Sequence, residues 1–212
     1  TADEAEGTGE GFFGEMRAGW DFLRHETVLL ANTLQATVAQ FTLGILIALT
    51  VIYASTVFGS EPVGPTAVWG FIETSIGLGN LVGGFIIGLI GARLAKGRMV
   101  IAGYAVWGLM VFVFAITDHL GLALGMSFGQ GVANMVFVIP SQTLFQQRTP
   151  AELMGRVVGF RFSLVFGSMT IAMGVGGLLT LILPVTTIIA VFGLLTMGAG
   201  LAGMLIPAVR DA

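Results

Sequence analysis

Six long apolar segments follow one another along this chain, each bounded by glycine, proline or charged residues. A helix needs roughly 20 apolar residues to cross the hydrocarbon core of a bilayer, and every one of these segments is long enough. We expect the spans at about residues 28–53, 67–90, 99–117, 122–145, 157–181 and 186–206. The pattern predicts an all-α membrane protein in which residues 27–212 form one six-helix transmembrane bundle.

Residues 1–26 have a different pattern. Residues 1–11 are rich in glycine and glutamate without apolar periodicity, which predicts a flexible cytoplasmic linker. From Phe12 onward, apolar residues such as Met16 and Trp20 recur at helical spacing, with charged residues on the remaining faces. This segment is expected to be a short amphipathic helix that lies in the membrane interface.

The basic residues predict the orientation of the bundle. Short cytoplasmic loops accumulate lysine and arginine, whereas short translocated loops avoid them. All nine basic residues fall on one side of the predicted spans. They are Arg17, Arg24, Arg93, Lys96, Arg98, Arg148, Arg156, Arg161 and Arg210. We therefore expect a multi-pass protein of the cell membrane with both termini in the cytoplasm.

Composition narrows the possible partners. The chain is 55% hydrophobic and only 10% charged, with a net charge of -3, so its solvent is the lipid bilayer and nucleic acid is not an expected partner. It has no cysteine, which excludes disulfides and thiolate ligands within it. Because it begins with Thr1 and an acidic segment, we expect it to be a piece of a longer protein.

Three segments carry a resemblance to a known family. Residues 14–23 (GEMRAGWDFL) resemble the helix that leads into the C-terminal half of efflux transporters of the major facilitator superfamily. Residues 142–157 (QTLFQQRTPAELMGRV) resemble the loop after the tenth helix in the same drug and macrolide efflux branch. Residues 91–98 (GARLAKGR) resemble that family's basic loop, although its characteristic aspartate is absent. The chain thus looks like the C-terminal six-helix half of such a transporter.

The resemblance implies a function and partners. It implies secondary active transport, in which small amphipathic or drug-like compounds leave the cell by exchange with an ion such as the proton. The partners would be the N-terminal six-helix half of the same chain, the bilayer and a small-molecule substrate bound between the halves near the midplane. No cofactor is implied.

Glu73 is the first candidate for a functional residue. It lies inside the second predicted span, where a carboxylate is costly unless it faces a wet cavity or a partner. One interpretation is proton coupling or recognition of a cation, and the other is a side chain that reaches water at the outer interface. Gly77, Asn80 and Gly84 extend a polar and small stripe from Glu73, which indicates either close helix packing or a mechanistic role.

Other polar residues form stripes on two more spans. Ser127, Gln130, Asn134 and Ser141 share one face of the fourth span, and the first span contributes a looser stripe containing Asn32 and Gln35. Such faces suit either the lining of a cavity or hydrogen bonds between helices. The candidates for substrate contact or coupling are Glu73, Asn80, Asn32, Gln35, Gln130 and Asn134.

The charged residues near the cytoplasmic ends are predicted to make loop contacts. Arg148, Glu152 and Arg156 would form a loop network or bind lipid head groups, and Arg93, Lys96 and Arg98 belong to the basic loop. Arg161 lies just inside the fifth span. It can extend to the cytoplasmic surface, which we expect, or pair with a carboxylate.

The main alternatives are a membrane-embedded enzyme and a non-transporting membrane protein. Intramembrane hydrolysis or lipid transfer needs paired acids, a serine with a histidine, or a metal held by histidines and acids. Glu73 is the only acid expected inside a span, and His25 and His119 lie at helix ends. We therefore expect neither an enzyme nor a metal site.

Overall fold

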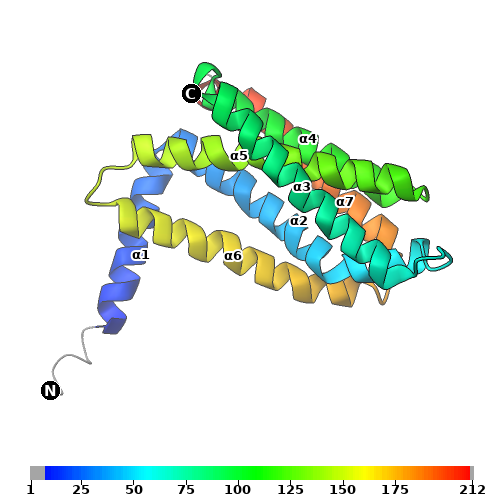
Figure 1. The fold of residues 1–212 in the computed structure, drawn as a ribbon. Coiled ribbons are helices and arrows are strands. Elements are labelled where there is room, and N and C mark those ends of the chain that lie inside the picture. The colour runs from blue at the N-terminus through cyan, green and yellow to red at the C-terminus, as the bar shows by residue number, and fades with distance from the viewer. Residues whose placement is uncertain (1–7, 211–212) are drawn as a thin grey trace, which may run out of the picture.

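The computed structural model describes residues 8–210, and within this range every regular element is helical. Seven long helices are connected by short loops (Figure 1). They are α1 (Thr8–His25), α2 (Thr27–Val57), α3 (Pro65–Ile90), α4 (Lys96–Ile116), α5 (Leu120–Arg148), α6 (Met154–Leu179) and α7 (Val185–Ala202). Three short helical turns complete the described chain: η2 (Gly91–Arg93), η3 (Gly203–Leu205) and α8 (Pro207–Arg210).

Helices α2 to α7 are the six expected spans. Each is long and apolar enough to cross a membrane, with α7 continuing through η3 to Leu205. Pro65 is the first residue of α3, and Gly64 before it takes a positive φ of 78°, which glycine adopts without strain. Helix α5 continues through Pro140 for two further turns, so the helix is longer than the predicted span.

Helix α1 lies across the bundle at the end where α2 and α6 begin (Figure 1). Its Gly19 meets the backbone of Arg156 on α6, and the Trp20 ring lies 5.6 Å from that of Phe160. The helix begins at Thr8, so the prediction of a flexible linker is wrong for residues 8–11, which are helical. The rest of that linker, residues 1–7, lies outside the described residues.

Neighbouring spans follow the order α3, α5, α4, α7, α2, α6, and α2 also contacts α3. The order is symmetric: α3 and α6 are at its two ends, α5 and α2 are next to them, and α4 and α7 are in the middle. The first three spans, α2 to α4, thus have the same neighbour relations as the last three, α5 to α7. The first helix of each group starts at opposite ends of the bundle (Figure 1). The bundle therefore has the pairing pattern of two three-helix units that run in opposite directions.

Glycines allow the closest helix contacts. A Cβ atom on Gly131 of α5 would lie 2.8 Å from the Cα of Gly79 on α3, and one on Gly193 of α7 would lie 2.7 Å from the backbone nitrogen of Phe112 on α4. By contrast, no described atom comes within 4 Å of a Cβ on Gly77 or Gly84. Helix α3 thus packs closely against α5 through the face that carries Gly79, and not through Gly77 and Gly84 of the stripe that begins at Glu73.

We predict that Gly131→Ala destabilises the bundle, because the added methyl group would overlap backbone atoms of α3, which cannot move away as a flexible side chain can. Overpacking of this kind costs about 1–3 kcal/mol. Gly125→Ala, on the same helix with open space around it, is the matched control. Thermal denaturation of both variants in detergent measures the difference. Equal melting temperatures would show that α3 and α5 do not approach closely at Gly131.

Candidate functional site

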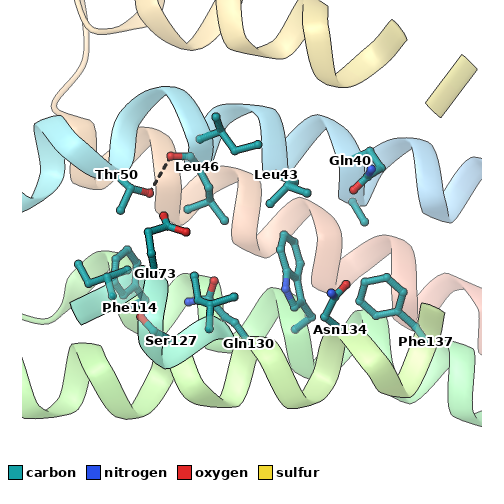
Figure 2. Close-up of a pocket in the computed structure, with 15 residues that line it drawn as sticks. Gln40, Leu43, Leu46, Thr50, Glu73, Phe114, Ser127, Gln130, Asn134 and Phe137 are labelled. Atoms are coloured by element: carbon teal, nitrogen blue, oxygen red, sulfur yellow. Dashed lines mark hydrogen bonds between the residues drawn. The ribbon is translucent and has the colours of Figure 1, made fainter. Parts of the chain in front are cut away.

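A cavity of about 110 Å³ lies between α2, α3, α4 and α5, and six of its fifteen lining residues are polar (Figure 2). Its polar side chains come from three of these helices, and Glu73 and Thr50 lie at one end with Gln40 and Asn134 at the other (Figure 2). The polar lining residues are Gln40, Thr50, Glu73, Ser127, Gln130 and Asn134. Three of the predicted candidates, Glu73, Gln130 and Asn134, therefore share one cavity.

Among the described residues that line the cavity, Glu73 supplies the only carboxylate, and its side chain is exposed. Its position eight residues after Pro65 lies about 12 Å along α3. The carboxylate extends toward α2 beside Thr50 (Figure 2), but it forms no hydrogen bond or ion pair with a described residue. An unpaired ionised group inside a membrane span needs water, a cation or a ligand as its partner.

The predicted amides divide into two groups. Asn134 Nδ2 donates to Asn80 Oδ1 at 3.0 Å, which joins α5 to α3. Gln35 Nε2 donates to the carbonyl oxygens of Ala199 and Gly200 at 3.0 and 3.3 Å, which joins α2 to α7. Gln130 is only 3% exposed, yet its side chain bonds to no described residue and lines the cavity. Asn80 and Gln35 thus act in helix association, and Gln130 is available to a ligand.

A second cavity of about 150 Å³ continues from the first toward the end of the bundle where α6 begins. The two cavities share Ala39, Gln40, Asn134 and Phe137, so they lie next to each other along α2 and α5. Aromatic rings from α4, α5 and α6 line the walls of the second cavity, and Ser141, Gln142 and Arg161 are polar members of the lining.

Arg161 lies inside the bundle instead of extending to its surface. Its Nη2 donates to Ser141 Oγ at 2.9 Å and to Asn32 Oδ1 at 3.4 Å, and Ser141 Oγ donates to the same Asn32 oxygen at 2.7 Å. The guanidinium carbon lies 4.3 Å from the centre of the Phe145 ring, within the range of a cation–π interaction. The expectation that Arg161 reaches the cytoplasmic surface is therefore wrong, and Asn32 contributes to this cluster.

The other charged loop residues lie at the end of the bundle where α1 crosses. Arg93, Arg98, Arg148, Glu152 and Arg156 are exposed, and Lys96 is half-buried. Among the described residues the structure has one ion pair, between Arg24 and Asp21 of α1 at 3.2 Å. It therefore contains no ion-paired network of Arg148, Glu152 and Arg156, while binding of lipid head groups by these residues stays a prediction.

Sequence reasoning missed Gln40 and Tyr104 as lining residues. Gln40 lies in both cavities and is eight residues from Asn32 on α2, so a search for further amides on that stripe would have found it. Tyr104 is buried and its ring stacks on Phe137 with centroids 4.2 Å apart. No polar periodicity around Tyr104 indicates this position.

Comparisons with models of known protein families, with curated proteins and with solved structures find no match for this chain. The class is defined by the helices of the described chain: a multi-pass, all-helical membrane protein with six candidate spans and an internal cavity.

We predict that Ser141→Ala destabilises the protein, because Ser141 both accepts from Arg161 and donates to Asn32. Removing a hydrogen-bond partner from a buried charged group costs about 1–3 kcal/mol. Ser163→Ala is the control: this exposed α6 residue bonds only to the Gly159 carbonyl of its own helix. Thermal denaturation that shifts equally for both variants would contradict the role of Ser141.

Proposed function

We propose that this chain is the C-terminal six-helix half of a secondary active transporter, which exports small amphipathic compounds in exchange for an ion such as the proton. The observation that carries the proposal is the polar cavity, in which the unpaired carboxylate of Glu73 lies among the amides of Gln40 and Gln130. Residues that cost free energy in lipid are concentrated along one path, as transport requires.

The helix arrangement supports this proposal. Transporters of the major facilitator superfamily contain two three-helix inverted repeats within each six-helix half. The exchange of α2, α3 and α4 for α5, α6 and α7 fits that organisation. Helices α3 and α6 are also the least buried spans, with 22% and 17% of their most apolar windows buried, and would have surface left for a second bundle.

The distribution of charge supports an orientation with both termini in the cytoplasm. Arg93, Arg98, Arg148 and Arg156 are exposed at the end of the bundle where α2 and α6 begin. The loops at the opposite end, residues 58–64, 117–119 and 180–184, contain no lysine or arginine. Under the positive-inside rule the first end faces the cytoplasm, in a cell membrane.

Glu73 is the group proposed to couple transport to the ion gradient. As a carboxylate it requires water or a cation, whereas as a protonated acid it is neutral and tolerates a closed, drier cavity. A protein whose cavity opens alternately to either side would load the proton outside and release it inside. The compound would travel in the opposite direction.

We predict that Glu73→Gln abolishes gradient-driven transport, because the amide cannot take up or release a proton. The assay is efflux of a panel of dyes and antibiotics from cells that express the full-length protein. Glu61→Gln, in the loop between α2 and α3, is the matched control and should transport at the wild-type rate.

Three outcomes of this experiment have distinct meanings. Loss of gradient-dependent efflux at normal abundance in the Glu73→Gln variant alone supports the proposed coupling. Unchanged efflux in that variant removes Glu73 from the mechanism and directs attention to Gln130. A wild-type protein that moves no compound under any ion gradient rejects the transport proposal and favours a non-transporting membrane protein.

A further inference from the structure

Arg161 carries a positive charge inside the bundle without an anionic partner among the described residues. Its hydrogen-bond acceptors, Ser141 Oγ and Asn32 Oδ1, are neutral, and the ion pair recorded among the described residues joins Arg24 to Asp21 instead. The Nε atom of Arg161 is buried without a hydrogen bond, and so is Nδ2 of Asn32. The guanidinium that borders the second cavity thus has one unused donor of its own, and the neighbouring Asn32 amide has another.

The cavity beside Arg161 has walls suited to a flat apolar molecule. The rings of Phe162 and Phe166 on α6 are parallel, with 5.3 Å between their centroids and 8° between their planes. Tyr104 and Phe137 form a second stacked pair, with centroids 4.2 Å apart. All four rings line this cavity together with Arg161. Aromatic walls favour planar apolar groups, and a guanidinium favours a carboxylate.

The negative charge of Glu73 and the positive charge of Arg161 lie in different cavities. Glu73 lines only the first cavity and Arg161 only the second, while Gln40 and Asn134 line both. A bound anion would thus be attracted at the Arg161 end and repelled at the Glu73 end. This separation would leave Glu73 free to exchange protons while the second cavity is occupied.

We propose that the second cavity is a binding site for an aromatic carboxylate, whose carboxylate pairs with Arg161 and whose ring lies between the two stacked aromatic pairs. The inference rests on the proposed function and names the substrate class: an organic anion. The carboxylate supplies the counter-ion that Arg161 lacks among the described residues.

The test is equilibrium binding to the full-length protein in nanodiscs of phosphatidylcholine, with empty nanodiscs as the blank. The probes are 2-naphthoate, the neutral 2-naphthamide and the cationic 2-naphthylmethylammonium, which share one ring system. The wild-type protein is expected to bind naphthoate about tenfold or more tightly than either other probe. Arg161→Gln should weaken naphthoate binding by about 10- to 100-fold, the effect of losing a hydrogen bond to a charged group, and leave naphthamide binding unchanged.

Two variants serve as controls. Arg156→Gln removes an exposed arginine from the same helix and should leave naphthoate binding unchanged. Arg148→Gln removes an exposed arginine from the end of α5 and should also leave naphthoate binding unchanged. Equal binding of the three probes by the wild-type protein overturns the proposal even if Arg161→Gln fails to fold. Naphthoate preference that persists in Arg161→Gln also overturns it.

This experiment is independent of the transport assay, since binding is measured without a gradient. Naphthoate binding that depends on Arg161 supports the anion site even in a protein that moves no compound. Gradient-driven efflux by a protein without preference for naphthoate rejects the anion site and leaves the transport proposal intact.

Discussion

Inside a membrane, the polar side chains of a helix must form their hydrogen bonds within the protein, because the lipid core offers none. Hydroxyl, amide and carboxylate side chains differ in how they satisfy this constraint. A hydroxyl group can bond the carbonyl one turn earlier in its own helix, as Thr33, Thr50 and Ser127 do at distances of 2.7–2.8 Å. The amide groups that have partners bond to other helices. Asn134 donates to Asn80 on α3, Gln35 donates to α7, and Asn32 accepts from α5 and α6. Gln130 and Glu73 have no such partner, and both lie in the first cavity.

This constraint explains why the polar cavity and the helix contacts use different residues. Lipid chains are as apolar as leucine, so helices associate through close contact and hydrogen bonds more than through burial of apolar surface. Gly79 and Gly131 bring α3 against α5, and the Asn80–Asn134 bond forms beside this contact. Glu73 and Gly77 lie on the face of α3 that also carries Asn80. No described atom lies within 4 Å of a Cβ atom placed on Gly77, and the Glu73 side chain is exposed. Glu73 lines the first cavity, where a ligand can replace its missing partner.

The spans were predictable because hydrophobicity over about 20 residues decides membrane insertion without reference to tertiary contacts. The cavity was predictable in part, since Glu73, Gln130 and Asn134 are polar residues inside apolar segments. Arg161 was not, because a long side chain near a helix end can reach water or turn inward, and the choice depends on Asn32 and Ser141, which lie on other helices. The use of Gly79 and Gly83 in place of Gly77 and Gly84 also depends on the crossing of α3 with α5.

The proposed function requires that the cavities along α2 and α5 open to water, and the absence of cysteine from this sequence allows this opening to be tested directly. Gln40→Cys introduces one thiol where the two cavities meet. Leu81→Cys introduces a thiol on an apolar face of α3, where the Leu81 side chain is 72% exposed. A thiol reacts with a membrane-impermeant maleimide only where water forms the thiolate. We predict that the Gln40→Cys variant is labelled in sealed vesicles, that a proton gradient changes the rate, and that the Leu81→Cys variant is not labelled. A Gln40→Cys variant that stays unlabelled from both faces of the membrane would contradict the account.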